Sequence, residues 1–271
     1  MKKIYFVSGF PRAGNTLLAS LLSQNPNITA TPYTYTPEIF FKIISIVNNS
    51  AVYNNFPNFK PINEVLKNVF HNSYAHCKTD YVIERSDWFT PYNMQVLQDY
   101  APNEIKIVIL VRDILEIIKS YLILCQQNPD FFINHEYNRL PRSSYYKTEI
   151  EDKADVIMAK GGHIDHTLYS IKYMMENHPD IIKFVEYNDL VCDTKNTLDS
   201  IYDFYNITRF QHDLNKLDEL SLDGVKYNDA VLGAPMHKLR NTSVSLPEHD
   251  FQLPESVIHR YSGLEFWRSP K

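Results

Sequence analysis

Two patterns of hydrophobic and polar residues alternate along the chain, one typical of buried strands and the other typical of helices that cover a sheet. Short apolar runs rich in β-branched and aromatic residues are typical of buried strands, and they occur at 4–8, 81–84, 105–111 and 181–185. Between and after them lie segments with apolar residues three or four positions apart, the pattern of helices that cover a sheet: 16–24, 37–47, 62–70, 91–100, 114–127, 163–177 and 194–205. This alternation predicts an α/β protein with three layers, a central parallel sheet flanked by helices.

Three long stretches fall outside this pattern, at 48–61, 128–153 and 211–254. They are polar or contain proline, so we expect long loops or irregular helical insertions, which in compact domains are usually lids or substrate-binding elements. No repeat or linker marks a domain boundary, and 271 residues suit one large α/β domain. The sequence therefore predicts a single domain over residues 1–271.

Charge and cysteine content narrow the class of protein. A net charge of −5 provides no overall basic field for nucleic acid, so an anion site has to be local. Cys77, Cys125 and Cys192 are widely spaced and lack a C-x-x-C pair, which argues against a disulfide framework and against a zinc site. No segment approaches the roughly 18 uncharged residues of a membrane span. We expect a cytoplasmic protein with neither nucleic acid nor membrane as its partner.

The first apolar run is followed by a near match to a nucleotide phosphate loop, SGFPRAGNTLL at 8–18. Gly9, Gly14 and Thr16 satisfy the pattern G-x-x-x-x-G-K-[ST], but Asn15 stands at the lysine position. A strand, a turn and a helix start would bring backbone N–H groups and the positive end of a helix dipole to one point. The stretch therefore predicts an anion site whether or not a lysine is present.

The missing lysine changes the chemistry expected at this loop. In triphosphate enzymes that lysine reaches the β- and γ-phosphates, so its absence disfavours phosphoryl transfer. A cation lies within the loop instead at Arg12, held by Pro11, where a guanidinium can bind two oxygens of a single phosphate. The plainer alternative is a strand-to-helix turn that carries an exposed arginine.

The segment PRAGNTLL at 11–18 resembles the P-R-S-G-T-T-L-L loop of sulfotransferases. In that family the loop cradles the 5′-phosphosulfate of 3′-phosphoadenosine 5′-phosphosulfate (PAPS). The resemblance implies a P-loop-like fold and a donor that has no γ-phosphate and requires no metal. It also implies that the donor is bound by Pro11, Arg12, Ala13, Gly14, Asn15, Thr16 and Leu17.

A second element of the family pattern is an arginine at the end of a later strand with a serine eight residues on. Here Arg112 follows the run IVILV at 107–111, and Ser120 preserves the spacing. The resemblance implies that both reach the donor's 3′-phosphate, which a helical spacing of two turns permits. Taken alone, Arg112 is equally a structural ion-pair partner and Ser120 a solvent-facing helix residue.

Two further segments are similar to the family in a more general way. KFVEYNDL at 183–190 resembles the strand whose tyrosine contacts adenine, which implies that role for Tyr187, although a half-buried tyrosine ending a strand is the commoner explanation. GAPMHKLR at 233–240 is similar to a late loop that closes over the donor in some bacterial members of the family. His237, Lys238 and Arg240 there add positive charge near the 3′-phosphate or form a solvated basic loop. The likeness fades near 48–80 and 128–162, where we expect acceptor-side insertions.

The reaction that the resemblance implies is an in-line displacement at sulfur. The acceptor loses a proton on one side while negative charge on the leaving phosphate is neutralised on the other. Arg12 suits the leaving side. Arg85, in the segment VIERSDW, stands where many relatives carry a lysine, and we expect it to stabilise charge because arginine does not donate a proton at pH 7.

The sequence leaves the identity of the general base open. Relatives that use a glutamate have it at the position of Tyr33 here, and Glu38 is the nearest carboxylate, although Pro37 and Glu38 are also typical of a helix start. Asp87 takes a position resembling that of the catalytic histidine of cytosolic sulfotransferases, or it pairs with Arg85.

Most of these features are explained if the protein is a sulfotransferase that moves a sulfuryl group from PAPS to a hydroxyl or amine of a small molecule or glycan. One alternative is a nucleotide kinase or NTPase with a degenerate loop, in which Asp113 would hold Mg²⁺. The other is a catalytically inactive protein that binds PAPS or its desulfated product, 3′-phosphoadenosine 5′-phosphate (PAP).

Overall fold

The centre of the protein is one parallel sheet of five strands. The computed structural model describes residues 2–139, 148–239, 241–246 and 250–268. The strand order is β2-β3-β1-β4-β5, and each neighbouring pair is parallel. The strands are β1 (Lys3–Gly9), β2 (Ile28–Ala30), β3 (Tyr81–Arg85), β4 (Ile107–Val111) and β5 (Ile182–Glu186). The sheet confirms the predicted α/β architecture.

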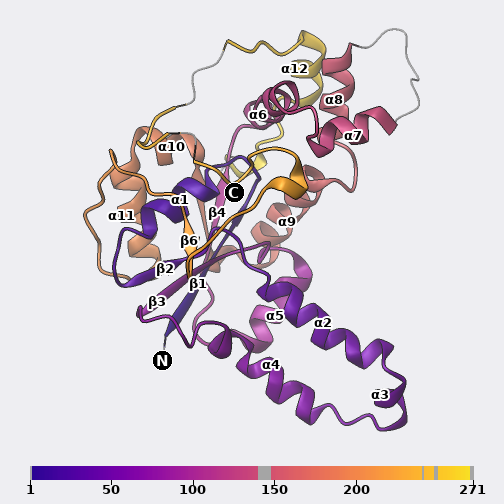
Figure 1. Cartoon of the computed structure of the whole chain (residues 1–271), viewed down its shortest axis with the longest axis vertical. Coiled ribbons are helices and arrows are strands. Elements are labelled where there is room, and N and C mark those ends of the chain that lie inside the picture. Colours follow the sequence, from indigo (N-terminus) through magenta and orange to yellow (C-terminus); the bar gives the residue numbers. More distant parts are fainter. Residues whose placement is uncertain (1, 140–147, 240, 247–249, 269–271) are drawn as a thin grey trace.

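Helices flank the sheet, as the periodicity predicted. In Figure 1, α1, α10 and α11 lie to the left of the strands and α5 and α9 to the right. The helices of the described residues are α1 (Asn15–Leu22), α2 (Thr36–Asn49), α3 (Ala51–Asn55), α4 (Lys60–Ser73), α5 (Pro91–Tyr100), α6 (Ile114–Gln127), α7 (Phe132–Arg139), α8 (Glu149–Ile157), α9 (His163–Asn177), α10 (Tyr187–Cys192), α11 (Thr194–Tyr205) and α12 (Glu255–Tyr261). Four of them, α5, α6, α9 and α11, have the predicted bounds. No helix in the described part of the chain is long and apolar enough to cross a bilayer.

The two central strands explain why the apolar runs are continuous. All five residues of β4 are buried, as are six of the seven residues of β1, because helices cover both faces of the sheet. The hydroxyl of Tyr205 in α11 donates a hydrogen bond of 2.7 Å to the carbonyl oxygen of Phe6 in β1. That bond fixes a covering helix directly to the sheet.

Two of the three stretches outside the periodic pattern are largely helical in their described parts, which is one of the two forms expected for them. The stretch 48–61 contains α3 and leads into α4, which packs on α2 to form an arm that projects from the sheet (Figure 1). The described part of 128–153 forms α7 and the start of α8, which pack on each other. Few side chains on α7 and α8 are buried, so their apolar periodicity is faint. The third stretch, 211–254, does lack long helices in its described parts and has only the hairpin of β6 (Ser221–Leu222) and β7 (Val225–Lys226) and one short 3-10 turn at Ala230–Leu232.

The strand order gives the sheet a switch point at β1. From β1 the chain goes to the edge strand β2 and returns to β3 beside β1; it then crosses to β4 on the other side of β1 and continues outward to β5. In open α/β sheets, ligands bind in the crevice at the carboxyl ends of the strands at such a point. At this edge β1 leads into the phosphate-loop segment, β3 ends at Arg85, β4 is followed by Arg112, and β5 is followed by Tyr187.

Candidate functional site

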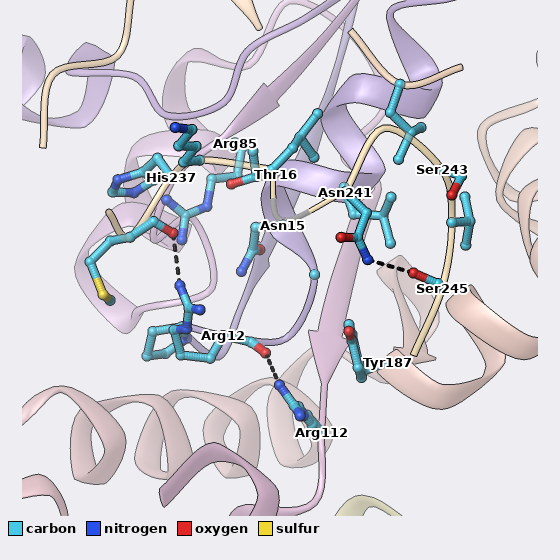
Figure 2. A pocket seen from close by; sticks show the side chains of 18 residues that line it. Arg12, Asn15, Thr16, Arg85, Arg112, Tyr187, His237, Asn241, Ser243 and Ser245 are labelled. Carbon is cyan, nitrogen blue, oxygen red and sulfur yellow. Dashed lines mark hydrogen bonds between the residues drawn. The ribbon is translucent and has the colours of Figure 1, made fainter. Parts of the chain in front are cut away.

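One pocket opens at this carboxyl edge and brings together most of the predicted site residues (Figure 2). Its walls come from the segment after β1, the ends of β3 and β4, the start of α10, Leu217, and a late segment with lining residues between 236 and 245. The lining residues are Pro11, Arg12, Gly14, Asn15, Thr16, Leu17, Arg85, Arg112, Tyr187, Leu217, Met236, His237, Lys238, Leu239, Asn241, Ser243, Val244 and Ser245. Of the predicted residues, Arg240 lies outside the described residues.

Backbone geometry shapes the loop between β1 and α1. Gly9 has φ of 135°, and a Cβ there would lie 2.1 Å from the carbonyl oxygen of Leu110, so β1 and β4 approach closely only with glycine at this position. Gly14 is the N-cap of α1 with φ of 88° and supplies no side-chain hydrogen bond to the first turn. The first N–H groups of a helix have no partner within the helix, so this turn is a suitable place for a bound anion.

Asn15 shows what replaces the lysine of triphosphate enzymes. Its side chain is buried, and Nδ2 donates a hydrogen bond of 2.8 Å to the carbonyl oxygen of Phe10. This buried hydrogen bond stabilises the conformation of the loop. Ala13 is completely buried and does not line the pocket.

The two predicted anion sites are joined by hydrogen bonds. Arg12, with φ of 65°, donates from Nη1 to the carbonyl oxygen of Met236 at 2.9 Å and from Nε to Oγ of Ser120 at 3.1 Å. Arg112 donates from Nη1 to the carbonyl oxygen of Arg12 at 2.8 Å. Both arginines line the pocket, as Figure 2 shows. Ser120 is 2% exposed and is not among the described residues that line the pocket. The hydroxyl of Ser120, expected from the resemblance to reach the 3′-phosphate, accepts a hydrogen bond from the guanidinium of Arg12.

Arg112 is positioned by neighbours on two helices. Its guanidinium carbon lies 4.3 Å from the centre of the Tyr187 ring at the start of α10, and Nη2 lies 3.5 Å from Oε2 of Glu116 in α6. A Cβ on Gly14 would come 3.0 Å from the same tyrosine ring. Tyr187 therefore packs against both the first loop and Arg112.

Arg85 provides a third positive charge at the pocket. Its backbone is fixed on both sides, since its N–H donates to Oγ1 of Thr31 at 3.0 Å and its carbonyl oxygen accepts from the N–H of Thr34 at 3.1 Å. The guanidinium carbon lies 4.7 Å from the centre of the Tyr33 ring. Burial lowers the pKa of Arg85, and the carboxylate of Asp87 opposes that change.

The two carboxylates proposed for catalysis lie elsewhere. Glu38 is exposed in the first turn of α2, directly after Pro37, which fits a helix start and does not place it at the pocket. Asp87 makes no ion pair with Arg85 within 4.0 Å and lines a second pocket. That second pocket is walled by α6 to α9 and the segment after β3, and its apolar lining includes Phe89, Tyr121, Phe132, Ile133, Val156, Ile157 and Ile164.

The late segment contributes a histidine with a carboxylate partner. Nδ1 of His237 lies 2.7 Å from Oδ1 of Asp229, and the His237 backbone N–H donates to Oδ2 at 2.8 Å. The imidazole stacks on Tyr227 with ring centres 3.9 Å apart. Burial lowers the pKa of His237, and Asp229 opposes the shift. Asp229 was missed in the sequence because it lies in an irregular segment where no motif pairs it with His237.

Comparisons with known proteins agree with this geometry. A family model described as the sulfotransferase domain matches residues 2–235. A sulfotransferase domain from the curacin biosynthetic pathway superposes with a TM-score of 0.55 at 15% sequence identity, over 97% of this chain and 98% of that one. The sulfotransferase domain of the Synechococcus PCC 7002 olefin synthase gives a TM-score of 0.52 at 16% identity, over 100% and 97% of the two chains. None of the curated proteins compared matches the sequence.

Proposed function

The chain belongs to the sulfotransferase domain family, and we propose that it transfers the sulfuryl group of PAPS to a hydroxyl or amine of a small molecule or glycan. The observation that carries the donor assignment is the single pocket lined at one end by Arg12 and the first turn of α1 and at the other by Arg112 and Tyr187. A nucleotide with phosphates at both its 5′ and 3′ positions presents negative charge at two separated points. The pocket has a cation for each.

In this assignment the 5′-phosphosulfate lies against the loop that follows β1. The N–H groups of the first turn and the guanidinium of Arg12 face the charge that grows on the leaving phosphate, which is where preorganised donors are most effective. Arg85 lies beside the sulfuryl group and stabilises its oxygens. No step requires a metal, because these groups already supply positive charge at the reacting end.

The nucleoside end is assigned to Arg112, Tyr187 and two residues of the late segment, Asn241 and Ser245. Arg112 binds the 3′-phosphate with a guanidinium that is held against Tyr187. The ring of Tyr187 provides a flat apolar surface for adenine. Asn241 and Ser245, joined by a hydrogen bond of 2.7 Å, provide polar groups on the opposite wall (Figure 2).

The acceptor is assigned to the second pocket, beside Asp87. Arg85 borders the donor pocket, and Asp87, which opposes the pKa shift of Arg85, lines the second one, so the two pockets approach each other at these residues. Seven of the residues that line the second pocket are apolar or aromatic, and seven are polar, among them Asp87, Glu136, His163 and His166. This mixed lining suits an acceptor that has an apolar or ring-bearing body together with polar groups.

Calorimetric titration of the protein with PAP, with 5′-AMP and with ATP plus Mg²⁺ tests the donor assignment. We expect PAP to bind most tightly, because only PAP carries a phosphate for Arg112. Tighter binding of ATP would overturn the proposal in favour of a nucleotide kinase or NTPase.

Turnover is tested separately with PAPS labelled in its sulfuryl group and a panel of phenols, aliphatic alcohols, sugars and amines. We expect acceptor-dependent formation of PAP together with a labelled sulfate ester or sulfamate. Binding of PAP without turnover of PAPS on any acceptor, water included, would identify a nucleotide-binding protein that has lost catalysis.

A further inference from the structure

We propose that His237, oriented by Asp229, is the general base that removes the proton of the acceptor during sulfuryl transfer. The inference rests on the proposed function and adds to it the residue that the sequence left open. It is carried by three features: the contacts that hold the imidazole, its position in the pocket, and the absence of a better base among the described residues that line the same pocket.

The carboxylate of Asp229 holds His237 at two points. One oxygen accepts the backbone N–H of His237 at 2.8 Å, and the other lies 2.7 Å from Nδ1 of the ring. With Nδ1–H donating to the carboxylate, the neutral imidazole has its lone pair on Nε2. Stacking on Tyr227, with ring centres 3.9 Å apart, limits rotation of the ring. A histidine whose second nitrogen is fixed by a carboxylate is the usual arrangement of a general base.

His237 lies at the reacting end of the pocket. Figure 2 shows His237 beside Arg85 and away from Arg112 and Tyr187, which are assigned to the nucleoside end. The positive charges of Arg85 and Arg12 both act on the imidazole. This position differs from the one expected from the sequence, where the late segment was assigned to the 3′-phosphate.

The surroundings of the ring keep it neutral at physiological pH. Burial lowers the pKa of His237, and the charges of Arg85 and Arg12 lower it further, while Asp229 raises it by accepting the Nδ1 proton. Tyr227, whose own pKa is raised by burial, covers one face of the ring as an uncharged phenol. Lys238 follows in the chain and adds a further positive charge at the pocket. A neutral imidazole is the form that accepts a proton.

The step balances without any further reactant. The acceptor oxygen or nitrogen gives its proton to Nε2 of His237 as it forms a bond to sulfur. The bond between sulfur and the bridging oxygen of the 5′-phosphate breaks, and its electron pair leaves with PAP, facing Arg12 and the first turn of α1. His237 then releases the proton to water, so the net products are the sulfated acceptor, PAP and one proton.

Two carboxylates compete with His237 for this role. Glu38 is exposed on α2 and does not line the donor pocket. Asp87 lines the second pocket, to which the acceptor is assigned, and its charge acts on Arg85 and Tyr33, so Asp87 is the competitor from which the substitutions of His237 distinguish the proposal. No aspartate or glutamate is among the described residues that line the donor pocket.

Three substitutions, His237→Asn, His237→Ala and Asp229→Asn, and a matched control test the assignment. His237→Asn keeps a donor toward Asp229 but removes Nε2, and Asp229→Asn removes the orienting charge. The control is His76→Asn, which disrupts a similar pair, since Nε2 of His76 lies 2.9 Å from Oδ2 of Asp223 at an exposed site away from the donor pocket. Each variant is assayed for PAP affinity by calorimetry and for turnover with labelled PAPS and the best acceptor of the panel.

For His237→Asn we expect kcat to fall by roughly 100- to 10,000-fold, the usual contribution of a general base. PAP affinity should change less than threefold, and added imidazole should restore part of the activity of His237→Ala. Because Asp229 raises the pKa of His237, Asp229→Asn should move the acid limb of the kcat profile to lower pH and reduce kcat. His76→Asn should behave as the wild type.

The outcomes separate this inference from the proposed function. Turnover of His237→Asn within threefold of the wild type would overturn the inference alone, and so would a loss confined to PAP affinity with kcat unchanged. An unshifted pH profile in Asp229→Asn would overturn the orienting role of the carboxylate. Failure of the wild-type protein to bind PAP would instead overturn the proposed function and this inference with it.

Discussion

Replacing Glu84 by glutamine removes a carboxyl group that is completely buried beside the site. Glu84 precedes Arg85 in β3, and its side chain is 0% exposed. Burial raises the pKa of Glu84 from 4.5 to about 7, while the hydroxyls of Thr36, Tyr74 and Thr34 oppose the rise. None of the described residues makes a hydrogen bond of good geometry to either carboxyl oxygen. We therefore expect Glu84 to be protonated in the folded protein below neutral pH.

The sign of the effect on stability follows from linkage. In the unfolded chain the carboxyl group of Glu84 has a pKa of 4.5, whereas in the folded protein its pKa is about 7. The folded state thus binds one proton more between these two values, so the free energy of unfolding falls as pH rises through that window. A difference of about 2.5 pKa units corresponds to about 3 kcal/mol of stability lost above pH 7.

Urea unfolding of the wild type and of Glu84→Gln at pH 5 and pH 8.5 measures this quantity. Glutamine has nearly the same shape and no charge to desolvate, so the two proteins should differ by about 1 kcal/mol or less at pH 5. At pH 8.5 the variant should be more stable by about 3 kcal/mol. Glu64→Gln, at an exposed site on α4, is the control and should leave the pH dependence unchanged. A variant that is equally destabilised at both pH values would refute the reasoning, because it would mean that the ionised carboxylate is satisfied in the fold.

Three substitutions at the site have expected outcomes of their own. Arg112→Met should lower PAP affinity roughly 10- to 100-fold in calorimetry, the effect of losing a charge-assisted hydrogen bond. The loss for 5′-AMP should be smaller, because 5′-AMP loses only the support that Arg112 gives to the Arg12 loop; equal losses for both nucleotides would contradict the assignment to the 3′-phosphate. Gly9→Ala should lower the melting temperature far more than Gly161→Ala, because its Cβ would lie 2.1 Å from the Leu110 carbonyl oxygen while nothing lies within 4 Å at Gly161; similar losses would count against the close approach. Asn15→Lys restores the triphosphate signature but removes the brace across the loop, so it should weaken PAP binding without creating ATP binding in calorimetry, and a gain of ATP affinity would contradict this.

The regular part of the fold was predictable because the sheet is covered on both faces. Strands such as β4 are buried throughout and therefore appear as unbroken apolar runs. Several helices also carry clear start signals, such as Thr90, which caps α5 ahead of Pro91, and Asp113, whose carboxylate accepts two N–H groups of α6. These signals are local, so sequence patterns suffice to place the bounds.

The helices of the insertions were not predictable from hydrophobic periodicity. In α8 only Ala154 and Ile157 are buried, and much of its support comes from contacts with α6, α7 and α12. A local signal was nevertheless present, since Thr148 and Glu151 form a reciprocal capping box at the start of α8. The strand β2 is only three residues long, too short to show a period.

The same distinction applies to the site: some of its residues could be predicted from the local sequence, and others are placed by tertiary packing. Sequence reasoning placed the loop after β1, Arg112 and Tyr187 at the edge of the sheet, since each follows a strand. It did not find the pairing of His237 with Asp229, because the segment that carries them is positioned by distant packing. Gly233, with φ of 69°, lies so close to Asp130 that a Cβ would come within 1.9 Å of its carbonyl oxygen.

The hydrogen bond from Arg112 to the carbonyl oxygen of Arg12 makes the two ends of the donor pocket one unit. The peptide of Arg12 is in the left-handed region, a conformation that a non-glycine residue keeps only when its surroundings hold it. The contact from Arg112 supplies part of that restraint, and Ser120 and Met236 hold the guanidinium. In the proposed assignment, the residue that recognises the 3′-phosphate therefore also fixes the residue that faces the leaving 5′-phosphate. A nucleotide without a 3′-phosphate would lose one ionic contact with Arg112, whereas removal of the Arg112 side chain would also remove a restraint on the loop where the sulfuryl group is transferred.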